Sequence, residues 1–236
     1  MTASSVLRVG HKGADLIAPG NTIASFDAAL EVGVDMIEFD VLPEHGGDRI
    51  LLAHDHRDAA RRSPLTLDDG LAYLGSEPFA GIGFVVDLKL PGYEPQVLEA
   101  LRVHDLVGRA LISTQYRESR ALIRETEPAV RLGWTVPKLH RDPFRSLATR
   151  LPAMAALQAF RLALPGRAAD AIKARQCDAL MAHWRLVTPR LVRRVRDAGG
   201  ELYVWTVDER PRIRALEALG VTGVITNDPR LFAGRA

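Results

Sequence analysis

Cysteine and lysine are scarce in this sequence, and each shortage excludes something. The single cysteine, Cys177, rules out an internal disulfide and a cysteine-based zinc site, and it suits a reducing compartment. Only four of the 31 basic residues are lysines, and the other 27 are arginines scattered along the chain. With a net charge of +2, this distribution gives no sign of a nucleic-acid partner.

Long apolar segments are also missing. The N-terminal "MTASSVLRVGHKG" lacks the basic region and apolar core of a secretory signal. The longest apolar-looking stretch, residues 151–164, is shorter than a membrane span of roughly 20 residues and contains Arg161. We interpret it as an amphipathic helix packed on a core, with a lid or interfacial role as the alternative. We therefore expect a cytoplasmic protein without a transmembrane segment, and the sequence leaves a homo-oligomer open.

What the sequence does contain is a regular alternation of two patterns. Short β-branched runs predict strands at 7–11, 36–41, 83–89, 110–115, 131–136, 178–184, 201–207 and 223–228. Stretches with helical periodicity lie between them at 22–33, 94–105, 117–128, 188–200 and 209–220. Eight such strands with helical crossovers favour an α/β protein, a closed (β/α)8 TIM barrel formed as one domain over residues 1–236.

Two connections depart from this alternation of strands and helices. An extended run at 49–55 follows the second strand through the turn-like "PEHGGD", which predicts a short hairpin excursion on the barrel and no large inserted domain. The long connection from 137 to 177 is expected to hold two helices.

Three carboxylates fall at the carboxyl ends of neighbouring strands, where barrel enzymes carry their chemistry. In "MIEFDV", Glu38 and Asp40 are two positions apart and share one face of the strand, so their charges repel. Asp87 comes from the next predicted barrel strand. Carboxylate oxygens are ligands that Mg²⁺ or Ca²⁺ prefers, so a divalent cation would resolve the repulsion.

Two histidines and a lysine accompany these acids. His11 follows the first strand and His54 lies on the hairpin excursion, and both titrate in the range needed for proton transfer near neutral pH. Lys89 shares a face with Asp87 and could contact a phosphate oxygen. Trp205 is a candidate for either the site or core packing. The remaining assignments are His183 as a further candidate, Asp208 and Asp228 as turn or cap residues, and His45, His56, His104 and His140 as surface residues.

Several motifs in this order resemble one known family. They are "HKGADLIAPGNTIASFDAALEVGVDMIEFDV" (11–41), "AHD" (53–55), "VVDLK" (85–89), "VWTVD" (204–208) and "GVTGVITNDP" (220–229). Together they look like the glycerophosphodiester phosphodiesterases, whose pattern runs from His-Arg-Gly through Pro-Glu-Asn-Thr, Glu-x-Asp-Val, His-Asp and Glu-x-Lys to a closing Thr-Asp-x-Pro. The resemblance spans almost the whole chain.

The resemblance implies a metal-dependent barrel, of the phospholipase C-like phosphodiesterase type, that cleaves small-molecule phosphodiesters into glycerol 3-phosphate and an alcohol. Carried over by position, the metal ligands would be Glu38, Asp40 and Asp87, the acid–base pair His11 and His54, the phosphate contacts Lys12 and Lys89, and a wall of the alcohol pocket Trp205.

Three positions depart from the family pattern. Lys12 stands for arginine, which keeps the charge but loses the bidentate fork, and Gly20 stands for the glutamate of Pro-Glu-Asn. Asp87 stands for glutamate and shortens the third ligand by one methylene.

Other functions stay open. A related phospholipase C- or sphingomyelinase D-like barrel would use similar residues on a lysophospholipid. A degenerate barrel would bind phosphodiesters without cleaving them, and a scaffold role would require the polar cluster to be incidental.

Overall fold

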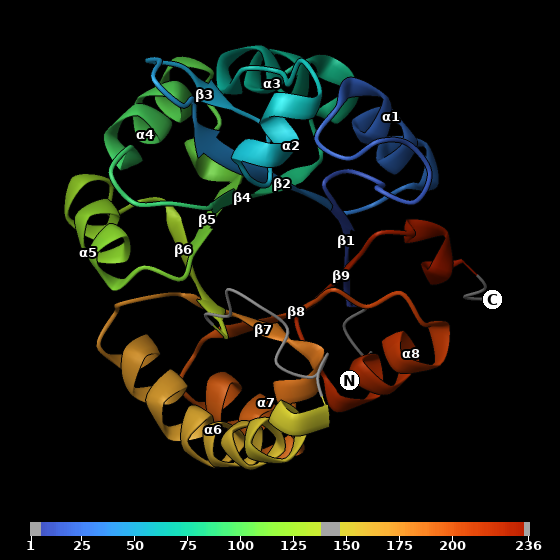
Figure 1. Ribbon diagram of the computed structural model, residues 1–236, viewed down its shortest axis with the longest axis vertical. Coiled ribbons are helices and arrows are strands. Elements are labelled where there is room, and N and C mark those ends of the chain that lie inside the picture. Colours follow the sequence, from blue (N-terminus) through green and yellow to red (C-terminus); the bar gives the residue numbers. More distant parts are fainter. Residues whose placement is uncertain (1–5, 138–146, 234–236) are drawn as a thin grey trace.

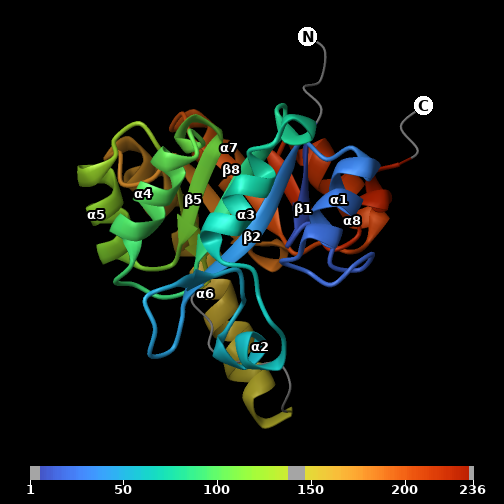
Figure 2. The ribbon, with the colours of Figure 1, turned by 90° about the horizontal axis from the view of Figure 1, so that it is seen from above.

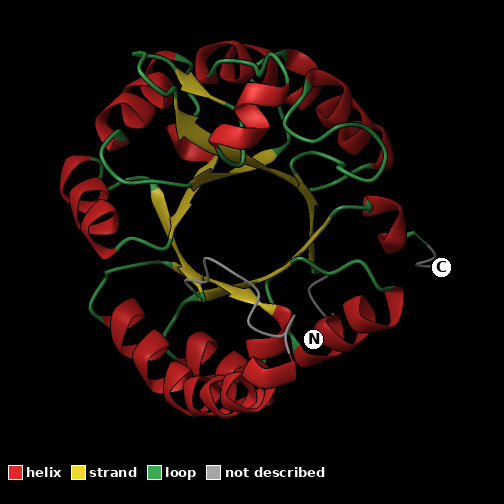
Figure 3. Ribbon diagram, in the orientation of Figure 1, coloured by secondary structure: helices red, strands yellow, loops and turns green. Residues whose placement is uncertain are grey.

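Eight parallel strands close into a barrel in the computed structural model, which describes residues 6–137 and 147–233 (Figures 1 and 3). Each strand pairs with the next, and the last pairs with the first. The strands are β1 (Leu7–His11), β2 (Met36–Pro43), β4 (Gly83–Leu88), β5 (Ala110–Thr114), β6 (Arg131–Val136), β7 (Ala179–His183), β8 (Glu201–Trp205) and β9 (Gly223–Thr226). The predicted (β/α)8 barrel is confirmed.

Helices surround the barrel between consecutive strands (Figure 1). They are α1 (Ile23–Val32), α3 (Leu67–Leu74), α4 (Glu94–Val103), α5 (Arg117–Thr126), α6 (Leu147–Lys173), α7 (Pro189–Asp197) and α8 (Arg210–Leu219). Short 3₁₀ helices lie at Glu77–Phe79, Val107–Arg109, Trp184–Leu186 and Pro229–Phe232. The first helix shows how sequence sets these bounds, because Thr22 and Ser25 form a capping box at its start and Gly33, at φ 82°, ends it.

The inside of the barrel is filled in layers. Side chains alternate along each strand, and the inward-facing set forms one buried cluster, made of Val9, Met36, Val85, Leu111, Ala179, Met181, Tyr203 and Ile225. One step further toward the carboxyl ends, the same faces carry polar side chains. Apolar side chains therefore fill the interior of the barrel. The polar side chains form the next layer, at the carboxyl ends of the strands, which is the barrel mouth.

The excursion after β2 is confirmed and is small. β3 (Ile50–Leu51) pairs antiparallel with β2, and α2 (His56–Arg61) follows it. Figure 2 shows α2 and the N-terminal part of α6 extending beyond the barrel on the same side.

The expectation of two helices between 137 and 177 is wrong for the described part, which forms the single helix α6. The helix continues through Pro165 and Gly166, although both residues disfavour a helix interior, and Leu164 and Ala168 on either side of them are buried in the core. Within the described ranges, no helix is both long enough and apolar enough to cross a membrane.

Candidate active site

Strand register brings the predicted acids together at the barrel mouth. β1 pairs with β2 so that His11 stands beside Glu38, and β2 pairs with β4 so that Asp40 stands beside Asp87. Each of the three acids offers an oxygen within 4.8 Å of the other two. Among the described residues they are the one such group of three, and the geometry is what their spacing in the sequence predicts.

A lysine ammonium lies among these acids. Lys89 Nζ is 2.5 Å from Asp40 Oδ1 and 2.5 Å from Asp87 Oδ2. Burial alone would raise the pKa of Asp40, but Lys89, followed by His11 and Lys12, outweighs it and holds that pKa below its usual range. Burial, aided by the neighbouring Asp40 charge, raises the pKa of Glu38 well above its usual range. The cluster thus holds more negative charge than one lysine neutralises.

These residues fit a hard divalent cation. The donors are three carboxylates from two adjacent strands, the ligand type that Mg²⁺ and Ca²⁺ favour. The Lys89 ammonium lies between Asp40 and Asp87, where it takes the place of a cation. Its position shows that these carboxylates favour a positive charge between them. The shorter Asp87 side chain still reaches the common point, so its departure from the family pattern does not break the cluster.

Two polar residues that the sequence analysis missed orient the acids. The Asn21 amide donates to Asp40 Oδ2 at 3.0 Å and accepts from the Asp40 backbone N–H at 3.1 Å. The Ser113 hydroxyl donates to Asp87 Oδ1 at 2.5 Å. Ser113 could have been found, because it is two residues beyond the inward-facing Leu111 on β5.

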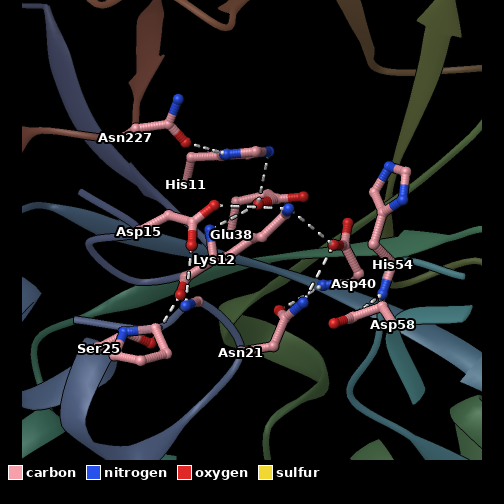
Figure 4. A network of polar contacts seen from close by, with 12 residues as sticks. His11, Lys12, Asp15, Asn21, Ser25, Glu38, Asp40, His54, Asp58 and Asn227 are labelled. Atoms are coloured by element: carbon pink, nitrogen blue, oxygen red, sulfur yellow. Dashed lines mark hydrogen bonds and ion pairs between the residues drawn. The ribbon is translucent and has the colours of Figure 1, made fainter. Parts of the chain in front are cut away.

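His11 is held by a chain of hydrogen bonds that starts at Asp208 and reaches it through Asn227, and Figure 4 shows the contact between Asn227 and His11. Asn227 Nδ2 donates to Asp208 Oδ2 at 2.7 Å, and Asn227 Oδ1 lies 2.5 Å from His11 Nδ1. Because a carboxylate only accepts, the amide oxygen must face the histidine, and His11 Nδ1 therefore carries the proton. His11 Nε2 lies on the side of Glu38, 3.8 Å from Oε2.

This chain corrects one assignment, that of Asp208, and adds one residue, Asn227. Asp208 is more than the expected turn residue, because it fixes Asn227, whereas Asp228 is a cap as expected. Asn227 follows Ile225 by two residues on β9, so alternation could have found it. Burial lowers the pKa of His11, with Lys12 adding to the effect against the opposing Asp40.

His54 is placed much more loosely. Its side chain is 53% exposed, and its ring Nδ1 is 3.4 Å from Asp55 Oδ2. The backbone N–H of His54 donates to Asp58 Oδ2 at 3.1 Å. Arg62 in turn donates to Asp58, to the carbonyl of Leu52 within the excursion and, at 3.5 Å, to the carbonyl of Asn21, which ties α2 to the β1–α1 loop of the barrel.

A cavity of about 490 Å³ opens between these groups. It is lined by six of the predicted residues, namely His11, Glu38, His54, Asp87, Lys89 and Trp205. Asp40 is fully buried beneath it, and Lys12 is not among the lining residues but lies 3.9 Å from Asp40 Oδ2. The backbone N–H of Lys12 also donates to Glu38 Oε2.

The other histidines are placed as follows. The surface assignment of His56 is wrong in one respect, because the excursion turns this exposed residue so that it lines the cavity. His45 is exposed, His104 pairs with Asp68, and His183 stacks on Trp184 next to Trp205. His140 lies outside the described residues.

Comparisons with known proteins agree on one family. The model of the glycerophosphoryl diester phosphodiesterase family matches residues 11–56 and 138–231. A glycerophosphodiester phosphodiesterase of Caldanaerobacter subterraneus is 24% identical, with 94% of each chain covered.

Solved structures share the fold. A phosphodiesterase of Oleispira antarctica, in complex with the product sn-glycerol-3-phosphate, has a TM-score of 0.67 at 18% identity, covering 96% of this chain and 94% of that one. A glycerophosphodiester phosphodiesterase of Agrobacterium tumefaciens has a TM-score of 0.67 at 20% identity, covering 97% and 99%. The family match takes in more than half of the chain, including His11, Glu38, Asp40 and His54. The chain therefore belongs to the glycerophosphoryl diester phosphodiesterase family, a family of phosphoric diester hydrolases.

Proposed function

We propose that the protein hydrolyses glycerophosphodiesters to sn-glycerol 3-phosphate and an alcohol. The observation that carries this proposal is the convergence of three carboxylates and two histidines on one cavity at the barrel mouth. Such a set offers both charge stabilisation and proton transfer, which phosphodiester hydrolysis requires. The Oleispira relative, whose structure contains the product, supports the same substrate class.

The cation in this proposal is Mg²⁺ or Ca²⁺, held by Glu38, Asp40 and Asp87. When bound, it would polarise the phosphoryl oxygens and neutralise charge that develops on them. Asn21 and Ser113 keep two of the acids oriented toward it. Lys89 and Lys12 add positive charge for the phosphate, and Trp205 forms a wall for the alcohol.

The two histidines then divide the proton transfers. Because Asn227 fixes the proton of His11 at Nδ1, the lone pair of the neutral ring is at Nε2, on the side of Glu38 and the cavity. His11 is thus suited to accept a proton from the attacking hydroxyl, either water or the glycerol 2-hydroxyl of the substrate. His54, at the exposed edge of the cavity, donates a proton to the leaving alkoxide.

A coupled assay for sn-glycerol 3-phosphate tests the proposal. Chelator-treated protein is incubated with a panel of glycerophosphodiesters, with and without added Mg²⁺ or Ca²⁺. Release of product that depends on the added cation supports the proposal. Binding of the phosphodiesters without hydrolysis across the panel would favour the degenerate barrel instead.

One feature of the cavity favours a second candidate substrate. Its lining includes apolar residues from several strand ends, namely Leu42, Leu88, Leu90 and Pro137, which could contact an acyl chain. Activity on micellar lysophospholipid that exceeds activity on soluble glycerophosphodiesters would identify a phospholipase-type enzyme.

A further inference from the structure

Lys12 has a fixed backbone and a side chain held only by charge. Its φ of 52° lies in the left-handed region, and its carbonyl accepts hydrogen bonds from Asn21 N at 2.9 Å and Ser25 Oγ at 2.7 Å. Its Nζ is 3.5 Å from Asp15 Oδ2 and 3.9 Å from Asp40 Oδ2. The position of the ammonium is therefore a balance between two carboxylates (Figure 4).

Asp15 occupies the room left by the glycine at position 20. The backbone N–H of Gly20 donates to Asp15 Oδ1 at 2.9 Å. A Cβ atom at position 20 would lie 2.5 Å from that oxygen and 2.8 Å from both Asp15 Cγ and Lys12 Cβ, closer than non-bonded atoms approach. Gly20 and Asp15 thus form a matched pair, and a side chain at position 20 would displace the Asp15 carboxylate.

The two carboxylates pull Lys12 in different directions. Asp40 belongs to the acid cluster and is fully buried, whereas the Asp15 side chain is 32% exposed and lies outside that cluster. Without Asp15, the nearest remaining carboxylate for the ammonium is Asp40. The negative charge on Asp15 therefore keeps the Lys12 ammonium from moving closer to Asp40, which is one of the ligands of the proposed cation.

We propose that Asp15 is the positioning residue for Lys12, and that it supplies the carboxylate that the family pattern places at position 20. In this chain the carboxylate comes from position 15 of the same loop, five positions before the family's glutamate, and the glycine at position 20 makes room for it. Asp15 acts on phosphate binding through Lys12 and does not touch the substrate. The proposal rests on the proposed function only in taking the ligand of Lys12 to be a phosphate.

The isosteric substitution Asp15→Asn separates this role from a purely structural one. Asparagine keeps an oxygen that can accept from Gly20 N, so the loop is retained, but it loses the charge that faces Lys12. Asp27→Asn is the matched control. Asp27 lies on α1, is also half-buried and accepts one hydrogen bond, which comes from Tyr73 of α3.

The experiment is a double-mutant cycle of Asp15→Asn and Lys12→Met. Binding of sn-glycerol 3-phosphate is measured by calorimetry at saturating Ca²⁺, together with KM and kcat for glycerophosphocholine. We expect Asp15→Asn to weaken binding and to raise KM by about fivefold, the upper range for a partly exposed ion pair, while kcat changes less than twofold. In the Lys12→Met background, Asp15→Asn should no longer weaken binding.

The sign of the change is the discriminating result. Removing a negative charge near an anion site would, by its field alone, tighten binding of the phosphate. Unchanged or tighter binding by Asp15→Asn, or the same loss in the Lys12→Met background, overturns the proposal. Binding without hydrolysis by the wild type refutes only the proposed function, and absence of binding by the wild type refutes the role of Lys12 as well.

Discussion

The two histidines at the barrel mouth are held in different ways. His11 ends β1, a strand paired on both sides, and its side chain is 20% exposed and hydrogen-bonded to Asn227. His54 lies on the excursion before α2, a helix with no buried residue, and its side chain is 53% exposed. The barrel thus fixes one histidine, while the other belongs to a segment of low local stability that can give way to substrate and product.

Replacement of either histidine should have the largest effect. We expect His11→Gly and His54→Gly each to lower kcat by about 10² to 10⁴-fold, the usual contribution of a general acid or base. Added imidazole should restore activity to His54→Gly, where the cavity left behind is open to solvent, and not to His11→Gly. The measurement is the steady-state rate of each variant as a function of imidazole concentration. Equal rescue of both variants would contradict the difference in how the two histidines are held.

The second-largest effect should be a difference in stability between the β1–α1 loop and the excursion. Asn21 is buried, makes two hydrogen bonds with Asp40 and has a φ of 58°, a conformation that asparagine tolerates better than alanine. Asn21→Ala should therefore lower the free energy of unfolding by about 2–4 kcal/mol in urea denaturation. Asp55→Ala, at the exposed N-cap of α2, should cost about 1 kcal/mol or less. Similar losses in the two variants would mean that the excursion is as tightly integrated as the loop between β1 and α1.

The tie between α2 and the barrel should affect turnover more than stability. Arg62 joins Asp58 to the carbonyl of Leu52, and Asp58 holds the backbone of His54. Arg62→Ala should lower kcat about tenfold, because a small displacement of an acid–base group is costly. Arg61→Ala, an exposed change on the same helix, is the matched control. A kcat for Arg62→Ala equal to that of the control would show that this tie does not position His54.

The smallest effect should be a pH dependence of the local opening of α2, caused by the same pair of Arg62 and Asp58. The hydrogen bond from Arg62 lowers the pKa of Asp58, against the opposing effect of burial. A carboxyl group whose folded pKa is depressed stabilises the folded form above its unfolded pKa, about 3.9, and this contribution is lost as the pH falls through the folded value. Amide exchange in α2, corrected for its intrinsic rate, should therefore accelerate below about pH 4 in the wild type and less steeply in Arg62→Ala, where the lowered pKa of the N-cap Asp55 still contributes. The same acceleration in both would contradict this account.

Much of the fold and half of the site follow from alternation along the strands. Period two placed Glu38 and Asp40 on one face, and strand order placed Asp87 beside them, because neighbouring parallel strands end at the same edge. The same rule extended by two residues along β5 and β9 reaches Ser113 and Asn227, whose uncharged side chains give no signal of their own in the sequence.

The remaining features depend on packing between distant segments. No local pattern shows that Lys89 bridges two acids, that Asp208 holds Asn227 across 19 residues, or that Asp15 fills the room at Gly20. The single helix α6 also depends on its packing, since Leu164, Ala168 and Ile172 bury its middle and end against the α7 side of the core. Propensity alone does not decide between one helix and two at Pro165.

The proposed activity depends most on the cation between Glu38, Asp40 and Asp87. Calorimetric titration of chelator-treated protein with Ca²⁺, and separately with Mg²⁺, tests it directly, with Asp40→Asn as the paired variant. Asparagine keeps the shape of the side chain and an oxygen that accepts from Asn21 Nδ2, but it removes the buried charge. We predict one ion bound per chain by the wild type and at least tenfold weaker binding by the variant. Absence of binding by the wild type with both ions, or equal binding by Asp40→Asn, would contradict the central claim.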